Sequence, residues 1–247
     1  MAELCKAHSH SLMLEIIKKI NVDIKNSSKS NLDENKLTST SRNKIARLIT
    51  KLNKKTHFND MQLTIICKLF HVLNDSSDRK LLPDYAYQQF LHVNLGITDT
   101  IALAGITRAV KKNPNKKGLL IKEFIMSLNV LLRGSIEEKC YLAFQIIDYN
   151  HDGLLHKNQE IANLMRNTFF ISLAEQKDGQ DDSFESEREM ADYIWKKFKD
   201  NRSPIDYECF KKMILREPIF LESLVKFLPD PSLSMTLQTL LFSNVKL

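Results

Sequence analysis

The chain has 247 residues, of which 43% are hydrophobic and 27% are charged, and it contains only six glycines and six prolines. That apolar content supports a real core, and so few turn-forming residues exclude a typical all-β protein. The formal charge of +6 is spread along the chain, and no nucleic-acid-binding motif accompanies it.

The basic residues include short clusters such as Lys111–Lys112 and Lys116–Lys117. We interpret them as solvated helix faces, with attraction to an acidic partner such as tubulin, nucleic acid or an anionic membrane as the alternative. The four cysteines lie far apart, no apolar run reaches about 18 residues, and no signal-peptide pattern is present. We therefore expect reduced thiols, a cytoplasmic setting and no membrane span.

The first half of the chain predicts helices separated by polar breaks. Residues 11–24 predict an amphipathic helix, and the polar stretch 26–43 predicts a linker, so that residues 1–41 form an N-terminal extension. Asn59 or Asp60 is expected to cap a later helix, Gly96 to end another, and Thr98 or Asp99 to cap the one that follows. Apolar residues recur at helical spacing in 44–52, 63–70, 87–91, 101–110 and 124–132.

The second half repeats the same rhythm. Ser135 and Glu138 predict a capping box that opens a helix extending to Ile147. Further helices are predicted at 161–169, 190–198, 207–215 and 220–228, with a polar loop at 176–187. The repeat of helix, break and helix every 35–45 residues or so indicates helix–loop–helix pairs. We expect an all-α fold with one lobe at 42–134 and a second at 135–247, the latter including a C-terminal helix and tail.

One break has a specific metal-binding pattern, Asp148-Tyr149-Asn150-His151-Asp152-Gly153-Leu154-Leu155. Calcium prefers six to eight oxygen ligands, and alternating side chains along a tight turn supply them. Asp148, Asn150 and Asp152 would offer side-chain oxygens, Gly153 would take the required turn conformation, and Leu154 would offer its carbonyl oxygen. Leu155 would pair with a neighbouring loop. The pattern predicts the first half of an EF-hand loop, with an Asn/Asp-rich turn as the plain alternative.

The second half of this loop departs from the pattern. The twelfth position needs a bidentate glutamate, but Gln159 stands there and Glu160 follows it. We expect a 13-residue loop closed by Glu160, with Gln159 as the alternative last ligand. Calcium is therefore expected at one site or at none.

The other breaks lack calcium ligands. In 112–123, Lys112, Pro114 and Lys116 replace the acidic residues, although Glu123 remains at the end. In 199–209 the loop is short and Cys209 stands where an acid is needed, and 74–84 has no alternating acids. We expect none of these loops to bind calcium.

Catalytic and zinc-binding patterns are missing from the sequence. The seven histidines form no H-E-x-x-H and no zinc-type Cys–His spacing, and no nucleotide-binding glycine motif occurs. We therefore expect no enzyme activity. Trp195 and Phe198 are expected in the core, with a partner-binding groove as the alternative.

From about Arg42 onward, the order and spacing of several segments resemble the calaxin family, EF-hand proteins of ciliary outer dynein arms. The matching segments are His57-Phe58-Asn59, Cys67-Lys68-Leu69-Phe70, Phe90-Leu91-His92-Val93, Gly96-Ile97-Thr98-Asp99, Leu132-Arg133-Gly134-Ser135-Ile136-Glu137-Glu138-Lys139, the Asp148 loop and Leu228-Pro229-Asp230-Pro231. The resemblance implies two EF-hand lobes like those of neuronal calcium sensors.

The same resemblance implies a function. The partners would be dynein heavy chain and the docking-complex coiled coil, with tubulin as a further candidate, in the axoneme of a cilium or flagellum. Since the loops have lost ligands, we expect a non-catalytic adaptor that supports motility with a weak or absent calcium response. The alternative is a calcium-responsive regulatory subunit that binds an amphipathic helix of a target outside cilia.

Overall fold

The computed structural model describes residues 39–74, 80–156, 160, 188–189, 191–193, 195–197, 204–223 and 227–242. The predicted helices at 11–24 and 161–169 lie outside these ranges. The described residues are overwhelmingly helical, with a single two-stranded sheet of two residues per strand, as the all-α prediction required. The chain divides into two compact units, residues 1–135 with 225–247, and residues 136–224.

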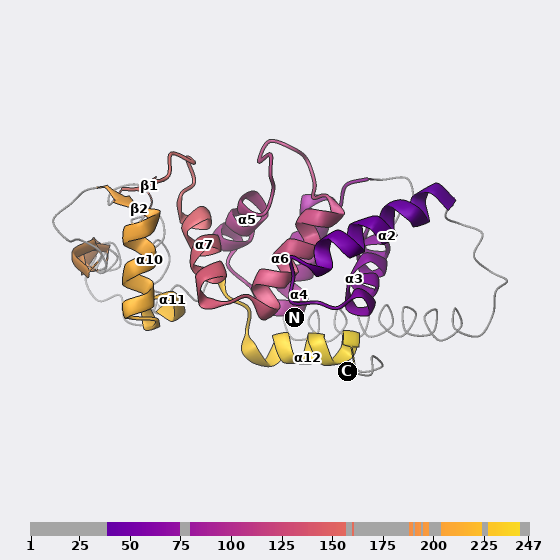
Figure 1. The fold of residues 1–247 in the computed structure, drawn as a ribbon. Helices are drawn as coiled ribbons and strands as arrows, with labels where there is room; N and C mark the ends of the chain where they lie inside the picture. Colours follow the sequence, from indigo (N-terminus) through magenta and orange to yellow (C-terminus); the bar gives the residue numbers. More distant parts are fainter. Residues whose placement is uncertain are drawn as a thin grey trace, which may run out of the picture. The chain divides into compact units, whose positions relative to one another are not determined.

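The first unit holds α2 (Ser39–Asn53), α3 (Asp60–Leu73), α4 (Asp84–Leu95), α5 (Thr100–Ala109), α6 (Ile121–Arg133) and α12 (Pro231–Phe242) (Figure 1). Helix α2 begins five residues before the predicted start, inside the expected linker. Asn43 and Lys44 are exposed, so a polar composition there is compatible with a solvated first part of the helix.

Local capping chemistry sets the helix boundaries that the sequence predicted. Asn59 and Gln62 form a capping box at the start of α3, each accepting the other's backbone N–H. Gly96 ends α4 in the left-handed conformation, at φ 70°. Asp99 caps α5 by accepting the N–H groups of Ile101 and Ala102.

The core of the first unit is built around Phe124 of α6, whose side chain is fully buried. Its ring centroid lies 5.6 Å from that of Phe70, 5.7 Å from that of Phe90 and 6.1 Å from that of Tyr87. These residues come from α3, α4 and α6, so one aromatic cluster joins both helix pairs of the unit.

Helix α12 packs with the first unit, whereas the sequence analysis assigned it to the second lobe at 135–247. It lies beside α4 (Figure 1), and the Asp230 N–H donates to the Leu95 carbonyl oxygen at 3.0 Å. The guanidinium of Arg133 donates to Gln238 at 2.9 Å and lies over the ring of Phe242 at 5.3 Å. These contacts join residues more than 100 positions apart, which the sequence pattern could not indicate.

The second unit contains α7 (Ile136–Ile147), β1 (Leu154–Leu155), β2 (Ile205–Asp206), α10 (Tyr207–Arg216) and α11 (Ile219–Ser223). Helices α7 and α10 pack together through Phe144, whose ring lies 5.5 Å from Tyr207 and 5.6 Å from Phe210. Trp195 is buried, as the core interpretation predicted.

Among the described residues, no single helix is both long and apolar enough to cross a membrane. Helices α4 and α5 meet the length and composition criterion only as a pair, which is bent by 119°.

Candidate functional site

Each unit joins its loops by a short antiparallel pairing. In the first unit, Leu82 and Leu119 exchange backbone hydrogen bonds of 2.8 and 2.9 Å. In the second unit, β1 and β2 pair Leu155 with Ile205. The prediction that Leu155 pairs with a neighbouring loop is therefore confirmed, and the arrangement is that of paired helix–loop–helix motifs.

The loop that begins at Asp148 folds through hydrogen bonds from backbone N–H groups to its own side chains. Asp148 Oδ2 accepts the N–H of Gly153 at 3.0 Å, and Asn150 Oδ1 accepts that of Asp152 at 2.9 Å. Asp152 Oδ1 accepts the N–H of Leu154 at 2.8 Å. Gly153 has φ 80°, the left-handed conformation that the sequence predicted for it.

The Asp152 carboxyl is held in its charged form. Its pKa is lowered, first by the hydrogen bond from the Leu154 N–H and then by the side chains of Asn150 and His156. His156 Nε2 lies 3.3 Å from Asp152 Oδ2, so protonation of this histidine would form an ion pair within the loop.

Glu160 is the residue that the sequence predicted to close the loop. Its Oε2 accepts the N–H of His156 at 2.9 Å. In the loop of the first unit that ends at Glu123, the equivalent bond runs from the Leu120 N–H to Glu123 Oε2 at 2.8 Å. The donor and the glutamate are four residues apart in the Asp148 loop and three residues apart in the loop that ends at Glu123. This difference of one residue is what an insertion of one residue would produce. Gln159, the alternative last ligand, lies outside the described residues.

Two buried carboxylate oxygens in this loop bear on whether its residues suit a calcium ion. Asp148 and Glu160 are buried, and neither Asp148 Oδ1 nor Glu160 Oε1 has a hydrogen-bond partner among the described residues. A buried, unpaired carboxylate oxygen is costly, and a divalent cation would satisfy it. The donor set of Asp148, Asn150, Asp152, the Leu154 carbonyl and Glu160 is all oxygen and fits calcium. No three acidic, histidine or cysteine residues of the described ranges converge as a ready metal cluster.

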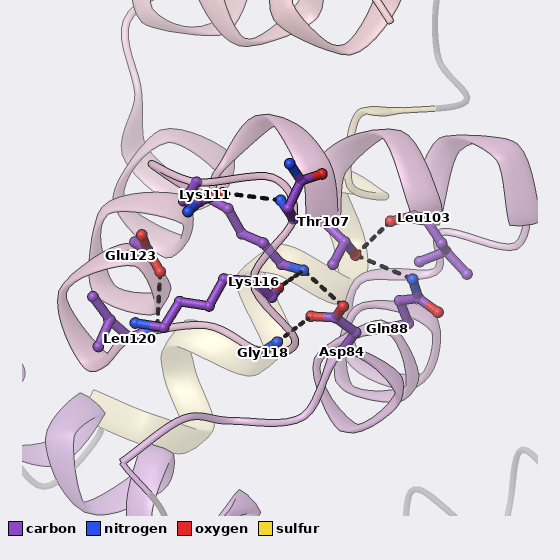
Figure 2. A network of polar contacts seen from close by, with 11 residues as sticks. Asp84, Gln88, Leu103, Thr107, Lys111, Lys116, Gly118, Leu120 and Glu123 are labelled. Atoms are coloured by element: carbon purple, nitrogen blue, oxygen red, sulfur yellow. Dashed lines mark hydrogen bonds and ion pairs between the residues drawn. The ribbon is translucent and has the colours of Figure 1, made fainter.

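The paired loops of the first unit are held together by a lysine ammonium (Figure 2). Lys111 Nζ donates to Asp84 Oδ2 at 2.6 Å and to the carbonyl oxygen of Lys116 at 2.9 Å. Asp84 Oδ1 accepts the N–H of Gly118 at 3.1 Å. Lys111 is buried, so interpreting it as part of a solvated helix face was wrong.

Glu123, the last residue of the loop at 112–123, accepts hydrogen bonds through both of its carboxylate oxygens. Its Oε2 accepts the N–H of Leu120 (Figure 2). Its Oε1 accepts the N–H of Lys112 at 2.9 Å. Both of its oxygens therefore bind the backbone at the two ends of the loop. The sequence analysis noted that Lys112 and Lys116 replace acidic residues but missed the role of Lys111, because its carboxylate partner lies 27 residues earlier.

The remaining loops are described only in part. Residues 75–79 and 198–203 lie outside the described ranges. Cys209 lies in the first turn of α10, where its N–H donates to Asp206. Phe124, Leu128 and Leu131 are buried in the core of the first unit.

No family model matches the chain. Calaxin from Homo sapiens is 27% identical over 209 residues, covering 82% of this chain and 96% of the relative. Calaxin from Xenopus laevis is 25% identical over 82% and 95% of the two chains, and calaxin from Danio rerio is 26% identical over 70% and 82%. Along most of its length, the chain is therefore similar in sequence to calaxins, at a divergent level of identity.

Proposed function

We propose that this protein is a non-catalytic EF-hand adaptor of the axonemal outer dynein arm and its docking complex, supporting ciliary or flagellar motility. Its first lobe would hold its partner without calcium. The proposal combines the calaxin-like sequence with the loss of calcium ligands in the first pair of loops.

The observation that carries the proposal is the Lys111 network. In the described parts of the two loops, 80–84 and 112–123, the carboxylates are Asp84 and Glu123, and their oxygens accept hydrogen bonds from Lys111 and from backbone N–H groups. Calcium would have to displace a buried ammonium and several N–H donors, and it would gain few oxygen ligands. The lysine therefore supplies the positive charge that a metal ion supplies in a calcium-loaded loop.

The experiment is a binding titration with recombinant segments of dynein heavy chain and of the docking-complex coiled coil. We expect the full chain to bind one of them with a dissociation constant that changes by less than about twofold between calcium and chelator. Loss of binding in chelator would refute the adaptor that acts without calcium. Imaging tests the location, and a protein that stays out of cilia would refute the axonemal assignment.

The second candidate function is a calcium-responsive sensor that works through the Asp148 loop. It is favoured by the unpartnered oxygens of Asp148 and Glu160. Bound calcium would supply a positive partner for both of these carboxylates. Working EF-hand sensors have dissociation constants of about 10⁻⁷ to 10⁻⁵ M. Calorimetric titration of calcium into the wild type and into the Asp148→Ala variant tests this candidate. A wild type that shows no heat of calcium binding in that range would refute it.

A further inference from the structure

A surface pocket of the first unit lies beside the Lys111 network. It has a volume of about 840 Å³ and is lined by Lys80, Leu81, Pro83, Asp84, Tyr85, Gln88 and Lys117. Most of these residues belong to the segment that leads into α4 and to the first turns of that helix. The pocket therefore lies within a single unit, and its wall is the loop pair that Lys111 holds closed.

The pocket has a net positive charge. Its one acidic residue, Asp84, is already neutralised by Lys111 and also accepts the Gly118 N–H. Lys80 and Lys117 are exposed, and neither forms an ion pair or a side-chain hydrogen bond with any residue that the structure describes. Among the residues that the structure describes, the two ammonium groups at the pocket therefore have no protein counter-charge.

The rest of the pocket lining is largely apolar. Leu81 and Pro83 are partly exposed, and the side chain of Tyr85 is 69% exposed although it lies on the first turn of a well-packed helix. An exposed tyrosine beside a hollow is typical of the centre of a protein–protein contact, because its ring adds apolar area at a low cost in conformational entropy.

We propose that this pocket docks a short acidic segment of a protein partner. One apolar side chain of that segment would lie against Leu81, Pro83 and Tyr85, and its carboxylates would pair with Lys80 and Lys117. A nucleic acid or an anionic membrane fits less well, because the described lining of the pocket offers two unpaired cations beside apolar side chains. The inference rests on the proposed adaptor function and specifies the chemistry of its partner.

Docking at this pocket is independent of calcium. Asp84 lines the pocket and is held by Lys111, while Lys117 stands next to Gly118, which Asp84 also holds. The positions of the pocket walls therefore follow from internal hydrogen bonds and need no bound metal.

The test uses the full chain and a fluorescein-labelled octapeptide that carries four glutamates around one leucine. We expect saturable binding with a dissociation constant below about 100 μM, which weakens with added salt and is the same in calcium and in chelator. The double variant K80E/K117E should weaken binding by roughly tenfold or more, because two attractive charges become repulsive. Tyr85→Ala should also weaken it, by roughly threefold or more.

Matched controls keep the result specific. K51E/K54E makes the same change in charge on exposed lysines outside the pocket, and it should bind as the wild type does apart from the general loss of charge. A peptide with glutamines in place of the glutamates, and one with glycine in place of the leucine, should both bind at least roughly fivefold more weakly.

Three results would overturn the inference. They are no saturable binding at about 1 mM peptide, an equal loss in K51E/K54E and K80E/K117E, or tighter binding of a short oligonucleotide or of phosphatidylserine vesicles than of the peptide. Such a failure leaves the adaptor function standing if the full chain still binds a dynein or docking-complex segment in chelator. Loss of that binding in the wild type would instead remove the function itself.

Discussion

Replacing Lys111 by methionine removes the ammonium that joins the loops of the first unit but keeps most of the apolar stem. The change deletes the 2.6 Å contact to Asp84 Oδ2 and the 2.9 Å contact to the Lys116 carbonyl oxygen. Asp84 keeps the Gly118 N–H, while the Lys116 carbonyl loses the donor. We expect the protein to fold and to be less stable.

The expected loss follows from the exposure of the two charged groups. A hydrogen bond to a charged group contributes about 1.5–3 kcal/mol. The Lys111 side chain is 5% exposed, but that of Asp84 is 38% exposed, so water takes over part of the interaction with the carboxylate. We therefore expect a loss of about 2–3 kcal/mol, below the range for breaking a fully buried pair. In a chain of this size that corresponds to a fall in Tm of roughly 5–10 °C.

The assay is thermal unfolding followed by circular dichroism in chelator, with hydrogen exchange at Gly118 and Leu119 as a local readout. Lys112→Met is the matched control, because the Lys112 side chain is exposed and only its backbone N–H contacts Glu123. The control should change stability by less than about 0.5 kcal/mol. If Lys111→Met melts within about 1 °C of the control, the lysine does not hold the loops and the reasoning fails.

Arg133→Lys keeps the charge but loses the planar group that lies 4.7 Å from the Phe58 ring and 5.3 Å from the Phe242 ring. Hydrogen exchange in α12 should therefore rise, while that in α5 should not. Unchanged exchange in α12 would show that Arg133 does not hold this helix. Burial raises the pKa of the Cys67 thiol to about 12 and that of Cys140 to about 11, above the value of 9.0 for an exposed thiol. Because the folded state resists ionisation of these thiols, their contribution to stability is fully present below about pH 9 and is lost as the pH rises towards 11. Mass spectrometry should also show that iodoacetamide does not modify either thiol at about pH 8 until the chain unfolds. Rapid alkylation of either thiol in the native protein would contradict this.

Features set by neighbouring residues were predictable from the sequence. Asn59 caps α3 and Gly96 ends α4 because capping needs only side chains and backbone groups within a few positions. In both cases the physical cause is contained in a short window of sequence. The position of Leu155 after Gly153 also predicted that it pairs with a neighbouring loop, but it did not identify the partner, Ile205.

Features that depend on distant residues were not predictable. Lys111 has the sequence context of a solvated lysine, and only the fold brings it to Asp84. The packing of α12 with the first unit depends on Arg133 and Gln238, which are 105 positions apart. The early start of α2 was missed because exposed polar residues permit a helix without predicting one.

The most direct test of a calcium-independent first lobe is a calcium titration followed by amide NMR of the full chain. The signals of Lys112, Gly118 and Leu120 report the hydrogen bonds to Glu123 and Asp84. We predict that they stay unchanged up to about 1 mM calcium, whether or not the Gly153 signal moves. A saturable shift of the Lys112 and Gly118 signals at micromolar calcium would contradict the account.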